Sequence, residues 1–220
     1  MDMVDMEVRR RPSSLLETFN ELLTRPLAGL DRARGGGDAS PLRLLAGSVV
    51  CYAFYGAAAG FFQGGDQILV AALKTPLIIL FSLLLCVPSL YVFSAVSGAN
   101  WTPKAFFAVL AGFAGTLALI LLALLPINWL FSASSRYVSS AVLLHFALWL
   151  LALGLAWRFL RQALGAVGSR SAMFLWLAVF CLVSLQATTL LRPVLERKPG
   201  TPLFVSGKKS FMEHFGDVLD

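Results

Sequence analysis

Five long stretches of the chain contain no Asp, Glu, Lys or Arg, and this feature constrains the fold more than any other. Each stretch has at least 19 residues, and together they cover residues 44–62, 75–95, 105–131, 137–157 and 171–191. A helix of about 20 apolar residues matches the roughly 30 Å hydrocarbon core of a bilayer. A transmembrane β-barrel would instead show shorter segments of alternating polarity. The sequence therefore predicts an all-α, polytopic transmembrane helical bundle of about five spans.

The composition agrees with a membrane protein and argues against other classes. Apolar residues make up 58% of the chain and charged residues 14%, whereas about a quarter of a soluble domain is charged. The net charge of +6 fits contact with the anionic headgroups of a lipid bilayer, and no basic stripe with interleaved aromatics predicts nucleic-acid binding. Cys51, Cys86 and Cys181 all lie within spans without His or Cys neighbours at metal-ligand spacing. We therefore expect no metal, no disulfide framework and no cofactor.

The chain divides into three parts: a polar N-terminal tail (1–41), the five-span bundle (42–193) and a polar, aromatic C-terminal tail (194–220). In the first part, Ser14 and Glu17 match a capping box. The residues that follow predict an amphipathic helix, because apolar side chains recur on one face: Leu15, Leu16, Phe19, Leu22 and Leu23. The polar face of this helix is not Lys- or Arg-rich, which favours docking on protein, either its own bundle or a partner. A helix loosely bound to the membrane surface is the alternative.

The distribution of basic residues indicates an orientation. With five spans and the N-terminus inside, eleven Lys and Arg fall on the inner side and seven on the outer side. Because inner loops carry an excess of Lys and Arg, the sequence predicts a cytoplasmic N-terminus and an outer C-terminus.

Several polar residues lie at membrane depth, where polar groups need partners and are functional candidates. His145 lies in the middle of the fourth span, and Gln186 and Thr189 lie in the fifth. The ordinary alternative is a hydrogen bond between helices, worth about 0.6 kcal/mol each. We expect Gln186 to bond to a neighbouring span, and Arg192 to contact headgroups or cap the end of the fifth span.

Small residues and two charges near the first turn form a second set of candidates. Gly56 and Gly60 form a GxxxG pattern that lets two helices approach closely, and a contact within the bundle is favoured over dimerisation. Asp66 and Lys74 flank the turn and are candidates for an ion pair near one membrane surface. Residues 66–74 form either an interfacial helix or an early start of the second span.

No catalytic motif is present, so we expect that the protein is not an enzyme. The spans contain no Asp or Glu, which leaves little for proton-coupled transport. The sequence therefore favours a non-catalytic integral membrane scaffold or subunit of a complex. Its partner, or a second copy in a homo-oligomer, would bind through the N-terminal helix or the C-terminal tail. The alternative is a small transporter or channel-like protein with a polar path near His145 and Gln186.

The layout resembles two groups of membrane proteins. One is the Yip family of five-span proteins, which residues 80–131 resemble through Pro88, Ser97-Gly98, Phe106-Phe107 and Pro126. Partners in that family are membrane-traffic GTPases, but the N-terminal tail here has no such site, so that role is not carried over. A second similarity covers about residues 50–215 and is to a group of uncharacterised bacterial five-span integral membrane proteins. It implies a bacterial cytoplasmic (inner) membrane location and rests on Phe54-Tyr55-Gly56, Lys74-Thr75-Pro76, Leu85-Cys86-Val87-Pro88-Ser89, Gln186 and Leu191-Arg192-Pro193.

Overall fold

The structure, a computed structural model, describes residues 14–25, 40–61, 65–96, 102–134, 138–164 and 170–190. Within these ranges it contains seven helices and no strand, which confirms the predicted all-α class. The helices are α2 (Leu15–Thr24), α4 (Ser40–Gly60), α5 (Gln67–Val96), α6 (Pro103–Ala123), α7 (Leu125–Ser134), α8 (Val138–Leu164) and α9 (Arg170–Leu190).

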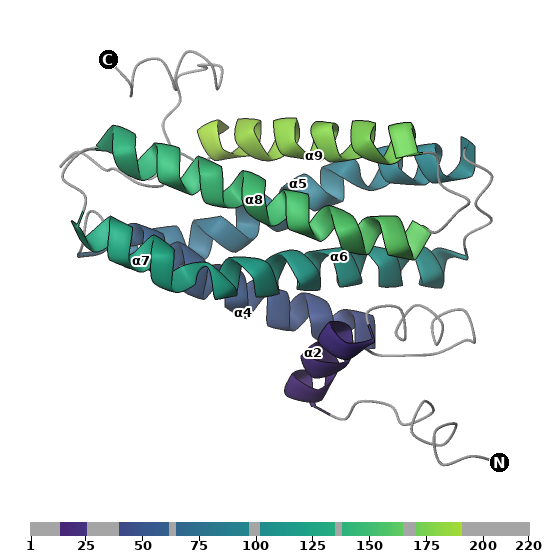
Figure 1. Ribbon diagram of the computed structural model, residues 1–220, viewed down its shortest axis with the longest axis horizontal. Coiled ribbons are helices and arrows are strands. Elements are labelled where there is room, and N and C mark those ends of the chain that lie inside the picture. Colours follow the sequence, from purple (N-terminus) through teal and green to yellow (C-terminus); the bar gives the residue numbers. More distant parts are fainter. Residues whose placement is uncertain are drawn as a thin grey trace.

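The long helices lie side by side and form one bundle (Figure 1). Helices α4, α5, α6, α8 and α9 run in alternating directions, and α7 continues the course of α6. Helix α6 contacts α4, α8 and α2 and has the largest buried share of the long apolar helices, whereas most of α8 is not buried. The short helix α2 lies outside the bundle, against α4 and α6. The core is therefore built around α6.

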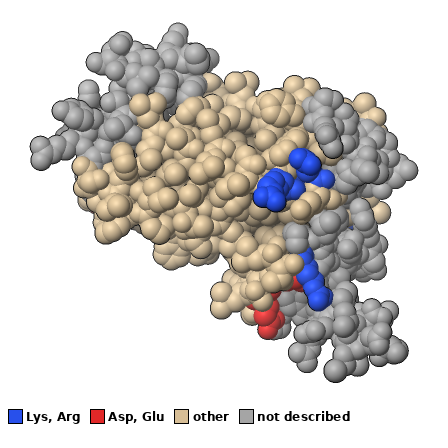
Figure 2. Space-filling model, in the orientation of Figure 1, with Lys and Arg blue, Asp and Glu red and all other residues tan. Residues whose placement is uncertain are grey.

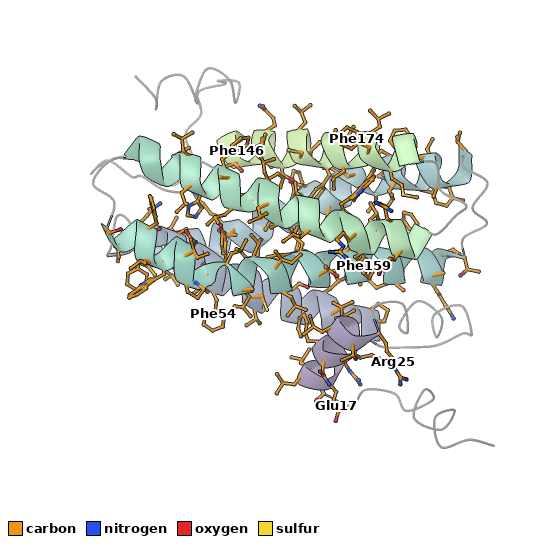
Figure 3. The ribbon with its side chains drawn as sticks, viewed as in Figure 1. Glu17, Arg25, Phe54, Phe146, Phe159 and Phe174 are labelled. Atoms are coloured by element: carbon orange, nitrogen blue, oxygen red, sulfur yellow. The ribbon has the colours of Figure 1, made fainter. Side chains whose placement is uncertain are left out.

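Four helices are long and apolar enough to cross a membrane, namely α4, α5, α6 and α8. The apolar part of α9 that the structure describes, Met173–Thr188, is shorter. Large apolar side chains cover the outside of the bundle, and Figure 3 shows Phe54 and Phe174 on the outer sides of α4 and α9. On the face drawn in Figure 2, the charged atoms of the described residues lie at one end of the bundle and around α2. An apolar surface of this extent fits insertion into lipid rather than contact with water.

Helix α6 packs closely because small residues cover its surface. Ala111, Ala114 and Ala118 are buried, and Gly112 leaves room for the ring of Phe159 from α8. Figure 3 shows Phe159 between α8 and α6. Small residues let helices approach closely in lipid, where packing rather than the hydrophobic effect holds helices together.

The predicted third span, residues 105–131, is divided between two helices that meet at Leu124. Helix α6 ends at Ala123, and α7 begins at Leu125. Pro126 explains the break, because proline has no N–H to donate and its ring clashes with the carbonyl group of Leu122 in a continuous helix. Pro126 instead occupies the first turn of α7, where a missing N–H costs nothing. The break allows α7 to contact α4 as well as α8.

Hydrogen bonds between helices fasten the bundle, and two of them join its long helices. The Tyr52 hydroxyl donates to the carbonyl oxygen of Ala114 at 2.6 Å and joins α4 to α6. The indole N–H of Trp176 donates to the carbonyl oxygen of Cys86 at 3.0 Å and joins α9 to α5. Both donors are fully buried, so each bond satisfies a group that lipid cannot solvate.

The N-terminal helix begins as the sequence predicts. The Ser14 side chain accepts from the backbone N–H of Glu17 at 3.2 Å, and the Glu17 carboxylate accepts from the backbone N–H of Ser14 at 3.3 Å. This reciprocal pair is the predicted capping box. The pair satisfies two backbone N–H groups at the start of α2, because the N–H groups of a helix's first turn have no acceptor within the helix.

Helix α2 docks on its own bundle, which is one of the two docking modes that its sequence favours. The absence of side chains at Gly47 in α4 and Gly115 in α6 makes room for Phe19 and Leu22. The predicted apolar face is only partly buried, because α2 meets two helices along a narrow strip. Its remaining leucines are exposed: Leu15, Leu16 and Leu23.

Candidate functional site

A partly open cavity of about 160 Å³ lies between five helices of the bundle. Helices α4, α5, α6, α8 and α9 all contribute to its wall. Most of the lining is apolar, and four of the lining side chains are aromatic. The lining residues are Tyr55, Ala59, Thr75, Ile78, Ile79, Leu121, Val142, His145, Phe146, Trp149, Ser184, Leu185 and Thr188.

The hydroxyls of three lining residues are bonded within their own helices. Thr75 donates to the Ala71 carbonyl oxygen at 2.8 Å. Ser184 and Thr188 donate to carbonyl oxygens one turn earlier, at 2.7 and 2.9 Å. These protons are therefore committed to the backbone, which is the usual way for a Ser or Thr side chain to be satisfied in a membrane helix.

Tyr55 differs from these three residues. Its side chain is 4% exposed, and its hydroxyl has no hydrogen-bond partner in the described part of the chain. A buried polar group left unsatisfied costs about 1–3 kcal/mol. The ring of Tyr55 packs against the imidazole of His145, with ring centroids 5.7 Å apart and planes tilted by 50°. Tyr55 and His145, the two titratable residues of the cavity lining, are therefore in contact.

Helix α7 fixes the backbone that carries Tyr55. The amide N–H of buried Asn128 donates to the carbonyl oxygen of Tyr55 at 3.3 Å. Ser132, one turn further along α7, donates to the amide oxygen of Asn128 at 3.5 Å. The break at Pro126 thus has a consequence for the site, because it sets α7 at the position from which Asn128 reaches α4.

An aromatic cluster adjoins the cavity wall at Trp149. Trp149, at the wall, stacks on Phe180 with centroids 6.2 Å apart. Phe180 in turn stacks on Trp176 at 5.6 Å, and Phe113 meets both rings edge-on. Phe113, Trp176 and Phe180 are fully buried. Trp149 therefore connects the cavity wall to a buried apolar cluster.

The structure brings His145 to the cavity but not Gln186. Gln186 is exposed on α9 and does not line the cavity. Ser184 and Thr188 line it instead, because residues four apart share a helix face whereas Gln186 is rotated by about 200° from Ser184. This i, i+4 spacing of hydroxyls was the available sequence signal. Thr189 belongs to α9, but its side chain lies outside the described part, as does Arg192.

Gly56 and Gly60 lie where α4 meets α5, which is the contact within the bundle that the sequence favours. A Cβ at Gly56 would lie 2.5 Å from the carbonyl oxygen of Ala71 and 2.8 Å from the Cβ of Thr75. A Cβ at Gly60 would lie 2.7 Å from the Cα of Ile68. Thr75 also lines the cavity. The close approach of α4 and α5 therefore lies next to the cavity wall.

Asp66 and Lys74 lie in different environments. Helix α5 starts at Gln67 and runs without interruption through residues 74 and 76, so residues 67–74 belong to the same helix as the predicted second span. Asp66 is exposed just before the helix, whereas Lys74 is buried with 6% exposure. The ion pair between these two residues stays a prediction from the sequence.

No three side chains of His, Cys, Asp or Glu gather as a metal site requires, within the ranges that the structure describes. No family model, no curated protein and no solved structure matches the chain. The resemblances to the Yip family and to the bacterial five-span group therefore stay expectations from the sequence.

Proposed function

We propose that the protein is a non-catalytic integral membrane scaffold or subunit of a membrane complex. In this proposal it crosses a bacterial cytoplasmic membrane five times, with the N-terminus in the cytoplasm. The observation that carries the proposal is the exposed row of leucines on α2, next to a helix face that docks on the bundle. The sequence contains no catalytic motif that would favour an enzyme instead.

The orientation is supported by basic side chains at one end of the bundle. Arg43 lies near the start of α4, Lys104 at the start of α6, and Arg158 and Arg161 near the end of α8. Because alternate helices run in opposite directions, these positions belong to the end at which α2 lies (Figures 1 and 2). Cytoplasmic loops carry the excess of Lys and Arg, which favours this end as the cytoplasmic one.

The docked helix presents a suitable contact surface for a partner. Phe19 and Leu22 face α4 and α6, while Leu16 and Leu23 are 82% and 68% exposed. Exposed apolar side chains on a helix already held in place by its other side lose little entropy when a partner covers them. A partner protein, or a second copy of the chain, would therefore bind α2 at the cytoplasmic end.

Native mass spectrometry of the protein released from lipid nanodiscs tests this proposal. We expect assemblies heavier than the 23.8 kDa chain, and we expect Leu16→Ser with Leu23→Ser to convert them to the monomer. Leu69→Ser is the matched control, because Leu69 is 66% exposed, close to the value for Leu23, but lies on α5 at the other end of the bundle. A monomer in every lipid composition, for the wild-type protein, would contradict the proposal.

A small transporter is the second candidate, favoured by His145 at the wall of a cavity. It requires a polar path through the whole bundle, whereas Trp149 of the cavity wall packs on the apolar cluster of Phe113, Trp176 and Phe180. A conduit predicts that proteoliposomes swell faster in glycerol and that His145→Ala changes the rate. A scaffold predicts neither effect.

A further inference from the structure

We propose that the cavity binds a small, uncharged, ring-sized molecule that carries an oxygen acceptor and enters from the bilayer. The hydroxyl of Tyr55 donates a hydrogen bond to that oxygen. This site is independent of the scaffold role, since it lies among the transmembrane helices and not on α2. The two proposals can therefore fail separately. The protein can assemble with a partner without binding such a molecule, or bind the molecule without assembling.

The size of the cavity limits the ligand to one ring. A dry, apolar cavity of about 150 Å³ in an engineered protein binds benzene, and the cavity here measures about 160 Å³. A single six-membered ring with a short substituent therefore fits. A whole lipid chain or a fused polycycle does not, unless most of it stays outside.

The lining excludes ions. None of the thirteen lining residues is Asp, Glu, Lys or Arg. Placing a charge in an apolar environment without a partner is unfavourable by far more than a hydrogen bond supplies. The rings of Phe146 and Trp149 and the side chains of Ile78 and Leu121 offer dispersion contacts to an apolar ring instead.

Among the hydroxyl groups of the lining, we assign that of Tyr55 as the donor to the ligand. The hydroxyls of Thr75, Ser184 and Thr188 already donate to carbonyl oxygens of their own helices. The Tyr55 hydroxyl, also at the wall, has no partner in the described residues. A ligand with an ether or carbonyl oxygen would satisfy it, whereas a hydrocarbon of the same shape would leave the hydroxyl unsatisfied.

Two probes of nearly equal shape separate these cases: 4-fluoroanisole, which has an ether oxygen, and 1-ethyl-4-fluorobenzene, which has none. Fluorine NMR of each probe is measured with protein in detergent micelles and, for partitioning, in micelles without protein. We expect saturable binding of both to the wild-type protein, with the anisole about fivefold tighter, as one net hydrogen bond predicts. In Tyr55→Phe the ratio of the two dissociation constants should fall to about one, while both probes still bind.

Tyr52→Phe is the matched control. It also removes one buried tyrosine hydroxyl from α4, but that hydroxyl bonds to Ala114 and does not line the cavity, so the fivefold ratio should persist. Val142→Phe narrows the cavity and should weaken both probes at least tenfold. The proposal is overturned if neither probe binds saturably to the wild-type protein, if Tyr55→Phe keeps the wild-type ratio, or if Val142→Phe binds both probes unchanged.

Discussion

The contact between α4 and α5 at Gly56 allows a quantitative test of the packing. In Gly56→Ala the new methyl group would lie 2.5 Å from the carbonyl oxygen of Ala71 and 2.8 Å from the Cβ of Thr75. Ordinary contacts are 3.4–4 Å, so the two helices must separate by several tenths of an ångström or more. The carbonyl oxygen is a backbone atom, so rotation of a side chain cannot relieve this contact. Overpacking of this kind costs about 1–3 kcal/mol.

Gly154→Ala is the matched control, because a Cβ at Gly154 in α8 meets no atom within 4 Å. Both substitutions replace a helical glycine by alanine, so the gain in helix propensity, about 1 kcal/mol, cancels in the comparison. We therefore expect the free energy of unfolding of Gly56→Ala to lie about 1–3 kcal/mol below that of Gly154→Ala. Reversible unfolding by SDS in mixed micelles, followed by circular dichroism, measures the difference. Equal stability of the two variants would refute the close approach of α4 and α5.

Three further perturbations test other contacts. Trp176→Phe removes the hydrogen bond to the carbonyl oxygen of Cys86 and should lower the free energy of unfolding by about 1 kcal/mol; unchanged stability in the same SDS titration would argue against this bond. Asn128→Ala removes the donor that holds the Tyr55 carbonyl oxygen and should weaken binding of 4-fluoroanisole severalfold, whereas unchanged binding would separate α7 from the site. Leu22→Ala removes the buried anchor of α2, a change worth about 2–5 kcal/mol in a core, so trypsin should cleave around α2 faster than in the wild-type protein; equal cleavage rates would mean that α2 is not docked.

Much of the fold follows from properties that a sequence displays directly. A helix that crosses lipid needs a long charge-free stretch, and such stretches are visible in the sequence. Four of the five predicted spans correspond to helices of sufficient length and composition. The capping box at Ser14 and Glu17 is a local pattern, and the local hydrogen bonds form as expected. The GxxxG pattern at Gly56 and Gly60 indicates a close helix contact, although it does not name the partner helix.

The break after Ala123 and the layout of α2 depend on tertiary packing. Pro126 suits the first turn of a helix as well as the interior of a kinked one, so the sequence did not decide between one helix and two. For α2, five apolar positions predict a wide face, but only the strip around Leu22 meets α4 and α6.

The candidate site was predictable only in part, because it joins side chains from five helices. His145 stands out as a lone titratable residue within a span. Tyr55 does not, since a tyrosine in a span is usually a satisfied or interfacial residue. That its hydroxyl has no partner among the described residues depends on the positions of α5, α8 and α9, which no local pattern specifies.

Topology of the two ends of the chain tests the account most directly. Green fluorescent protein fused to the N-terminus fluoresces only in the cytoplasm, and alkaline phosphatase fused to the C-terminus is active only outside the cytoplasmic membrane. A chain of five membrane-crossing helices with a basic inner end predicts that both reporters are active in bacterial cells. Inactive phosphatase together with a fluorescent N-terminal fusion would place both ends in the cytoplasm and contradict the five crossings.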